Sequence, residues 1–339
     1  MKYLFFAGQA YSISILRPLQ AAIIKRGDKV AWYLNHLPSS LLNENEDLLE
    51  TIEDAKNYKA DAIFAPGNWI PDFFPGIKVS IFHGFGTDKK GHFRIRGFFD
   101  LYCTHGPATT KPFNKLAKKH GYFSVVETGW PKMDPLFSHT REKTDSDNNA
   151  RKVILYAPTF SPSLTSAPAL LEPIKALIKA SDYKWIVKFH PKTDISIIKQ
   201  YRKIENSKLT ISEGADIIPL LHQSDIMVTD TSSVISEFLL LDKPVITLNN
   251  RTPGPHLINI TEPDKLNQAL DRAVKRDDDL IRAASAFIDQ MHPYRDGQSS
   301  DRILDATENF INNNMARKKP LNLWRKFQTR KNMKYYHFK

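Results

Sequence analysis

The sequence of 339 residues has little of what marks several protein classes. Its single cysteine, Cys103, excludes an intramolecular disulfide, so a reducing cytoplasm is the expected compartment. No apolar run approaches the roughly 18 residues that a membrane-spanning helix needs. The apolar run at residues 4–7 is too short for a secretory signal. We therefore expect a globular cytoplasmic protein.

Several catalytic motifs are missing as well. No Gly-x-Ser-x-Gly elbow occurs, and no Gly-x-Gly-x-x-Gly follows the first expected strand. Hydrolases and dinucleotide oxidoreductases are therefore not among the leading interpretations. No Cys/His cluster has zinc spacing, and the acidic run at residues 277–279 is interpreted as a solvated helix face. No metal site and no cofactor is predicted, and the need for a divalent metal is left open.

Positive charge is unevenly distributed. The net charge is +11, but nine basic residues and no acidic one lie in residues 317–339, which leaves +2 for the rest of the chain. The same segment carries Trp324, Phe327, Tyr335 and Tyr336. Residues 316–339 are therefore interpreted as a basic aromatic tail on a nearly neutral body.

Short apolar runs alternate with amphipathic stretches along the body, which predicts βαβ units and parallel sheets in an α/β protein. The expected strands are residues 3–7, 29–34, 62–65, 78–82, 101–104, 153–157, 185–189, 209–212, 226–229 and 245–248. The polar segment 138–151 is the best linker candidate. We expect Rossmann-like domains at 1–140 and 151–300 with a cleft between them, a terminal helix at 301–315 and then the tail.

Polar residues follow three of these strands directly. His83 and Gly84 follow the strand at 78–82, Lys188 and His190 lie at the end of 185–189, and residues 230–233 follow 226–229. In such sheets ligands bind at the carboxyl ends of strands. His83 is the candidate general base, and His190 beside Lys188 could stabilise phosphate charge or move a proton. Either histidine could instead be structural.

The run after the strand at 226–229 is Asp230, Thr231, Ser232 and Ser233, and a helix is expected at 234–241. Amide groups at a helix start together with hydroxyls form a phosphate cradle. The alternative is an ordinary N-cap, but three consecutive hydroxyls favour an anion site. Glu237 could accept hydrogen bonds from a ribose, although a solvated carboxylate is the more common case.

Several segments in order resemble the CDP-glycerol glycerophosphotransferase family of teichoic-acid type enzymes. They are DIIPLLHQSDIMVTDTSSVISEFLLLDKPVITL at 216–248, YAPTF at 156–160, KFHP at 188–191, GWPKMD at 129–134 and YRDGQSSDR at 294–302. The resemblance covers roughly residues 78–305. Two departures are Phe85–Gly86 after the His-Gly pair and Thr231 where the family usually has Tyr.

The resemblance implies a GT-B fold with the donor nucleotide on the C-terminal domain and the acceptor side on the N-terminal one. It implies transfer of glycerol phosphate, or a related polyol phosphate, from a CDP-linked donor to a cell-envelope or capsule glycan or lipid-linked acceptor, with release of CMP. By position, the family's two histidines match His83 and His190. Its other site residues match Ser232, Ser233, Asp296, Gly297 and Ser299, and Thr159, within the matching segment YAPTF, is expected to line the cleft.

Alternatives remain open at this point. A GT-B glycosyltransferase or a sugar-nucleotide epimerase-like enzyme would share the fold, and a catalytically silent binding module would keep the fold without the chemistry. The tail is predicted to bind an anionic membrane surface, which gives a peripheral location on the inner face of the membrane. An RNA-binding or disordered tail is the alternative, and no nucleic acid is expected as a partner. The sequence leaves the polyol, the acceptor, polymerisation and the oligomeric state open.

Overall fold

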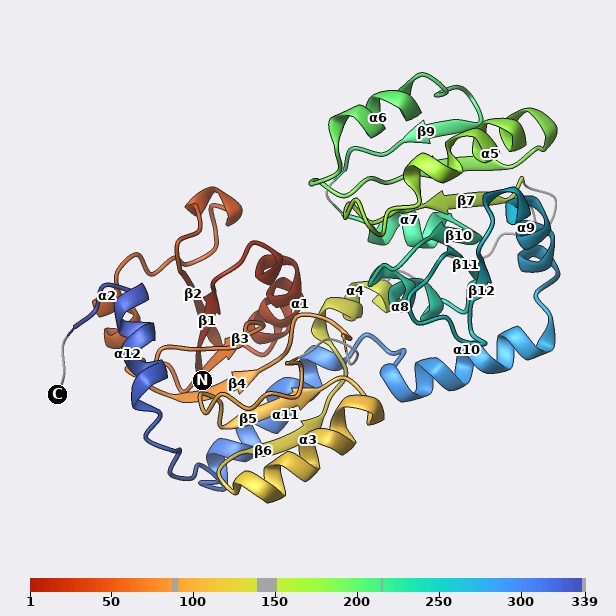
Figure 1. Cartoon of the computed structure of the whole chain (residues 1–339). Coiled ribbons are helices and arrows are strands. Elements are labelled where there is room, and N and C mark those ends of the chain that lie inside the picture. Colours follow the sequence, from red (N-terminus) through yellow and green to blue (C-terminus); the bar gives the residue numbers. More distant parts are fainter. Residues whose placement is uncertain (87–90, 139–150, 215, 337–339) are drawn as a thin grey trace. The chain divides into compact units, whose positions relative to one another are not determined.

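The computed structural model describes residues 1–86, 91–138, 151–214 and 216–336. Internal contacts divide the chain into two units, Met1–Ser138 with Gln290–Lys339, and His139–Asp289 (Figure 1). Each unit contains a six-stranded sheet in which all neighbouring strands are parallel. The expected α/β class is confirmed. Most of the predicted linker, residues 139–150, lies outside the described residues.

The first unit has the strand order β2-β1-β3-β4-β5-β6. Its strands are β1 Lys2–Ala7, β2 Lys29–Leu34, β3 Ala62–Ala65, β4 Ile77–Ser80, β5 Leu101–Thr104 and β6 Ser124–Glu127. The inner strands β1, β3 and β5 are buried almost throughout, as expected for apolar strands covered on both faces of a parallel sheet. The order reverses between β1 and β3, where loops at the carboxyl ends of the strands diverge.

The helices of the first unit follow from local sequence signals. Helix α1 buries Ile13, Leu16 and Leu19 at helical spacing, and Thr51 and Asp54 form a capping box at α2. The bounds are α1 Tyr11–Lys25, η1 Ser39–Leu41, α2 Ile52–Asn57, α3 Pro107–His120, η2 Pro131–Met133, α4 Asp134–Ser138, α11 Ser299–Asn312 and α12 Leu323–Asn332.

The second unit has the strand order β12-β11-β10-β7-β8-β9, which is the doubly wound order 3-2-1-4-5-6 of a Rossmann fold. Its strands are β7 Val153–Tyr156, β8 Lys184–Val187, β9 Leu209–Ile211, β10 Ile226–Thr229, β11 Val245–Leu248 and β12 Ile258–Ile260. Its helices are α5 Ala167–Ala180, α6 Ile195–Arg202, α7 Ile218–Gln223, α8 Val234–Leu239, η4 Pro263–Lys265, α9 Leu266–Lys275 and α10 Asp278–Met291. The last two residues of α10 belong to the first unit. The order reverses between β7 and β10.

The C-terminal segment groups differently from the domains expected from sequence. Residues from Gln290 onward belong by contact to the first unit, whereas the sequence analysis assigned residues up to 300 to the second domain. Helix α11 buries Ile303, Leu304 and Phe310, and Arg26, which directly follows α1, pairs with Asp301 at 2.9 Å. The apolar face of α11 therefore completes the core of the first unit.

The segment expected as a tail is folded onto the first unit. Arg330 of α12 pairs with Asp72 at 2.5 Å, and Lys319 pairs with Asp100 at 2.6 Å. Met333 is 7% exposed and joins the apolar core. Residues 316–336 therefore pack on the first unit, where acidic partners neutralise part of their charge. In the described part of the chain, no helix is both long and apolar enough to cross a bilayer.

Candidate active site

The loops after β7 and β10 are joined at the reversal point of the second unit. Asp230 is fully buried, and its carboxylate accepts the Thr159 N–H at 3.1 Å, the Ser166 N–H at 2.9 Å and the Ser166 O–H at 3.0 Å. Burial raises the pKa of Asp230, while these hydrogen bonds act in the opposite direction. Asp230 therefore acts as a scaffold that fixes the loop after β7 against β10.

The three hydroxyls that follow Asp230 differ in their surroundings. The Thr231 hydroxyl accepts the Arg251 N–H at 3.1 Å, and the Ser232 hydroxyl accepts the Val234 N–H at 3.4 Å. Ser233 is exposed at the N-cap of α8, and its side chain makes no capping bond there. Helix α8 has six residues, shorter than the expected 234–241, so local N–H groups and hydroxyls matter here more than a long helix dipole.

Glu237 is not the solvated carboxylate considered as its more common case. It is 4% exposed on α8. At this exposure Glu237 belongs to the interior of the second unit. Its prediction as a ribose ligand stays untested.

His190 lies just beyond β8, and its geometry selects one tautomer. The Lys192 N–H donates to its Nδ1 at 3.1 Å, so in the neutral ring the proton is on Nε2, which is then a donor. The ring stacks on Phe160 with centroids 4.4 Å apart, and the Lys192 ammonium lies 5.7 Å from the same phenyl ring. Partial burial and the positive charge of Lys192 lower the pKa of His190, which favours the neutral donor form at neutral pH.

Lys188 is the first residue after β8. Its ammonium donates to the carbonyl of Gly214. Together with the stack of His190 on Phe160, this gives a continuous polar edge across the neighbouring strands β10, β7 and β8. The edge carries seven of the residues predicted from sequence, namely Thr159, Lys188, His190, Asp230, Thr231, Ser232 and Ser233.

His83 lies at the reversal point of the first unit. Its Nδ1 is 3.0 Å from the carbonyl oxygen of Pro66, just after β3, so Nδ1 must carry the proton and Nε2 is left as an acceptor. The ring stacks with Tyr11, at the start of α1, with centroids 5.5 Å apart. His83 is exposed. The preceding Phe82 has φ +57°, a left-handed conformation that non-glycine residues adopt rarely and mostly at functional turns.

Phe85 fixes the loop behind His83 and Gly84. It is 5% exposed, and its ring packs against Trp130 at 5.0 Å, His105 at 5.1 Å and His292 at 5.8 Å. Nε2 of His292 accepts the Trp130 N–H at 2.9 Å. Burial lowers the pKa of His292 to about 4 and lowers that of His105 well below its usual value. Both rings are therefore neutral parts of the core. Residues 87–90 lie outside the described residues.

The late Asp-Gly-x-x-Ser segment lies in the first unit, not in the expected nucleotide domain. Asp296 pairs with Arg302 through two bonds of 2.8 and 3.0 Å, and Gly297 has φ +68°. Ser299 is buried, and its N–H donates to Asp134 at 2.9 Å. In this unit these residues organise the start of α11, and their assignment as donor ligands is not tested.

Sequence reasoning missed four contributors to these sites. Tyr11 and Pro66 orient His83, and Phe160 and Lys192 orient His190. Pro66 and Lys192 act through backbone groups, for which side-chain identity gives no signal. Position just after a strand could have identified Phe160, which is 38% exposed. In the described segments, no group of three or more His, Cys, Asp or Glu residues could hold a metal ion.

The two Rossmann-like sheets define a GT-B type α/β protein. The solved structure of the wall teichoic acid polymerase TagF with CDPG superposes with a TM-score of 0.66 at 18% identity, covering 93% of this chain and 90% of that one. A putative UDP-N-acetylglucosamine 2-epimerase from Listeria monocytogenes gives a TM-score of 0.67 at 14% identity, covering 92% and 97%. At these identities the likeness establishes the fold alone.

The family follows from sequence. The model of the CDP-Glycerol:Poly(glycerophosphate) glycerophosphotransferase family matches residues 98–309, and the chain belongs to this family. The teichoic acid glycerol-phosphate primase of Bacillus subtilis (strain 168) is 27% identical over 241 residues, covering 66% of this chain and 61% of the primase. The ribitol-phosphate polymerase TarK of Staphylococcus aureus (strain NCTC 8325 / PS 47) is 25% identical over 300 residues, covering 73% and 56%. The chain thus spans only part of the length of these relatives.

Proposed function

We propose that the protein transfers a polyol phosphate, glycerol phosphate or a relative such as ribitol phosphate, from a CDP-linked donor to a hydroxyl of a cell-envelope or capsule acceptor. The observation that carries this proposal is that the backbone leaves an acceptor nitrogen on His83 in the first unit and a donor nitrogen on His190 in the second. Family membership supplies the donor class, and relatives named for both glycerol and ribitol leave the polyol to experiment.

In the proposed reaction the acceptor hydroxyl attacks the phosphorus that bears the polyol. A new O–P bond forms, the bond from that phosphorus to the bridging oxygen breaks, and CMP leaves. His83 takes the hydroxyl proton on Nε2 as general base. Proton transfer by a positioned side chain typically contributes a factor of about 10² to 10⁴.

The second unit would hold the donor. Ser232, Ser233 and the first N–H groups of α8 would bind the diphosphate, and His190 would donate from Nε2 to a phosphate oxygen. Phosphoryl transfer depends mostly on positioning and on stabilising negative charge on the transferring and leaving groups. Asp230 would keep the cradle rigid, and Lys188 would add positive charge nearby. The proposal requires that one substrate engage both units.

The proposed acceptor is a glycan, either free or carried on a lipid. A lipid carrier would put the reaction at the membrane surface, and a soluble nucleotide donor would put it on the cytoplasmic side. A peripheral location on the inner face of the membrane is therefore part of the proposal.

The decisive experiment is a screen of CDP-alcohols with CMP release as the readout. CDP-glycerol and CDP-ribitol should release CMP in the presence of an acceptor, and His83→Ala and His190→Ala should each lower turnover by about 10² or more. His120→Ala, an exposed histidine on α3, is the matched control. Near-normal turnover in both site variants would refute the mechanism.

A thermal-shift comparison separates the alternative enzymes. A ligand that binds only the folded protein raises its melting temperature by mass action. CDP-glycerol or CDP-ribitol should stabilise the chain more than UDP-sugars do. Preferential stabilisation by UDP-sugars would favour a glycosyltransferase or an epimerase-like enzyme, and stabilisation without any CMP release would favour a silent binding module.

A further inference from the structure

Helix α12 exposes one continuous face. Leu323 and Trp324 are 70% and 69% exposed, Phe327 is 44% exposed, and Gln328 and Lys331 are exposed as well. With 3.6 residues per turn these five positions fall on a single side of the helix. We call them the α12 outer face. The indole of Trp324 and the ring of Phe327 stack with centroids 6.0 Å apart, and Leu321, just before the helix, is 69% exposed.

The opposite face of α12 is held by the first unit. Thr329 and Met333 are buried, Arg330 pairs with Asp72, and Lys326 lies 3.9 Å from the same carboxylate. After the helix, Tyr335 packs on Phe73 at 4.3 Å and accepts a hydrogen bond from Lys56 of α2 at 2.8 Å. The orientation of α12 is therefore fixed. The apolar side chains of its outer face remain exposed to solvent, because no other part of the described chain covers them.

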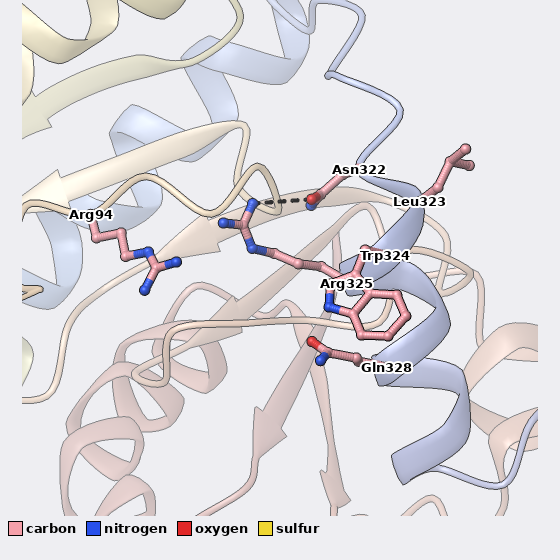
Figure 2. Close-up of a pocket in the computed structure, with 6 residues that line it drawn as sticks. All are labelled: Arg94, Asn322, Leu323, Trp324, Arg325 and Gln328. Carbon is pink, nitrogen blue, oxygen red and sulfur yellow. Dashed lines mark hydrogen bonds between the residues drawn. The ribbon is translucent and has the colours of Figure 1, made fainter.

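A positively charged pocket adjoins this face. It measures about 520 Å³ and is lined by Arg94, Asn322, Leu323, Trp324, Arg325 and Gln328. In Figure 2, Arg94 comes from one side and the remaining five residues from α12 and its start. Arg325 donates to the carbonyl of Arg96 and to the side chain of Asn322, at 3.2 and 3.1 Å. No carboxylate is among the lining residues, so two guanidinium groups share the pocket without an acidic counterpart from the described segments.

We propose that the α12 outer face and the Arg94–Arg325 pocket together form a docking surface for anionic phospholipid. Leu321, Leu323, Trp324 and Phe327 enter the boundary between headgroups and acyl chains, and the two arginines with Lys331 bind lipid phosphates. Interfacial helices combine an apolar face, aromatic residues and cations in this way. The inference does not depend on the transfer reaction, because docking needs neither donor nor acceptor.

The chemistry of the surface favours lipid over two other occupants. Single-stranded nucleic acid gains from aromatic stacking, but Leu321 and Leu323 offer no ring and stay exposed beside the pocket. A second copy of the chain, bound through the same patch on both copies, would bring like-charged arginines together at the interface. An anionic membrane matches both the apolar and the positively charged parts of the surface.

Vesicle co-sedimentation of the full chain tests the proposal. The protein should bind vesicles of phosphatidylcholine mixed with phosphatidylglycerol and bind phosphatidylcholine alone much more weakly. Arg94→Gln should lower binding to the mixed vesicles by about fivefold, as expected for one interfacial charge. The double variant Leu323→Ser with Phe327→Ser should lower it by tenfold or more. Ile24→Ser, which removes a 60% exposed side chain on α1, and Lys118→Gln on α3 are matched controls.

Fluorescence gives a second readout, with a conservative variant that should keep the fold. Brominated lipid in the mixed vesicles should quench tryptophan emission in the unaltered chain, and the quenching should largely disappear in Trp324→Phe, which keeps the aromatic surface and should still bind. Equal binding to both vesicle types, or unchanged binding of the Leu323/Phe327 variant, would overturn the proposal. So would tighter binding of a single-stranded RNA, or a stable dimer that these variants dissolve.

Discussion

The neutral imidazole of His292 should make the first unit sensitive to acid. Burial lowers the pKa of His292 from 6.5 to about 4. Between these two values the unfolded chain binds a proton that the folded chain refuses, so stability falls as the pH falls through this window. At 1.36 kcal/mol per pKa unit, the loss from this one group is about 3 kcal/mol. Above pH 6.5 the group is neutral in both states and has no effect.

The variant His292→Gln isolates this effect. A glutamine carbonyl can still accept the Trp130 N–H but does not titrate. Between pH 6.5 and pH 4, the free energy of unfolding measured with urea should therefore fall by about 3 kcal/mol more in the wild type than in the variant. Four of the five tryptophans lie in the first unit, so the background change Trp185→Phe restricts the fluorescence signal to it. The exposed His120→Gln is the control. Parallel pH dependence in wild type and His292→Gln would refute the reasoning.

Two further substitutions test the scaffolds behind the two sites. Asp230→Asn should destabilise the second unit by about 3 kcal/mol, because an amide has one acceptor oxygen in place of two and its NH2 group then faces N–H donors of the loop after β7. Urea unfolding followed by the part of the tryptophan emission change that Trp185→Phe removes measures this, and a loss below experimental error would contradict the scaffold role. Phe85→Ala should lower the free energy of unfolding of the first unit by about 3–5 kcal/mol and slow CMP release. Phe85→Leu should restore much of both. Unchanged CMP release in Phe85→Ala would show that Phe85 does not position His83.

The inner strands could be predicted from sequence because burial on both faces imposes an apolar run. The inner strands at 62–65, 101–104, 226–229 and 245–248 match residue for residue. The edge strand at 29–34 also matches, because most of its residues are buried. Strands β6 and β12 were missed because both lie at sheet edges and are only partly buried, so their sequences do not need to be apolar. The rule that ligands bind beyond strand ends identified the polar edge of the second unit and the turn that carries His83.

Long-range contacts account for what the sequence did not predict. The packing of the basic segment could not be predicted from sequence, because its partners Asp72 and Asp100 lie more than 200 residues earlier in the chain. Glu237 reads as solvated because helical spacing alone does not reveal which face of a short helix is covered. The unit to which residues 290–300 belong depends on where the apolar face of α11 packs, and that too is a tertiary property.

The backbone partners of the two histidines predict unequal responses to one substitution. Nδ1 of His83 donates to a carbonyl and Nδ1 of His190 accepts from an amide, so Nε2 is an acceptor in the first ring and a donor in the second. A glutamine amide can donate a hydrogen bond near the position of Nε2, but it cannot take up a proton. His190→Gln should therefore retain at least tenfold more CMP release than His190→Ala, whereas His83→Gln should be as inactive as His83→Ala. Steady-state rates for the four variants with one CDP-alcohol measure this, and substantial activity in His83→Gln would exclude His83 as the base.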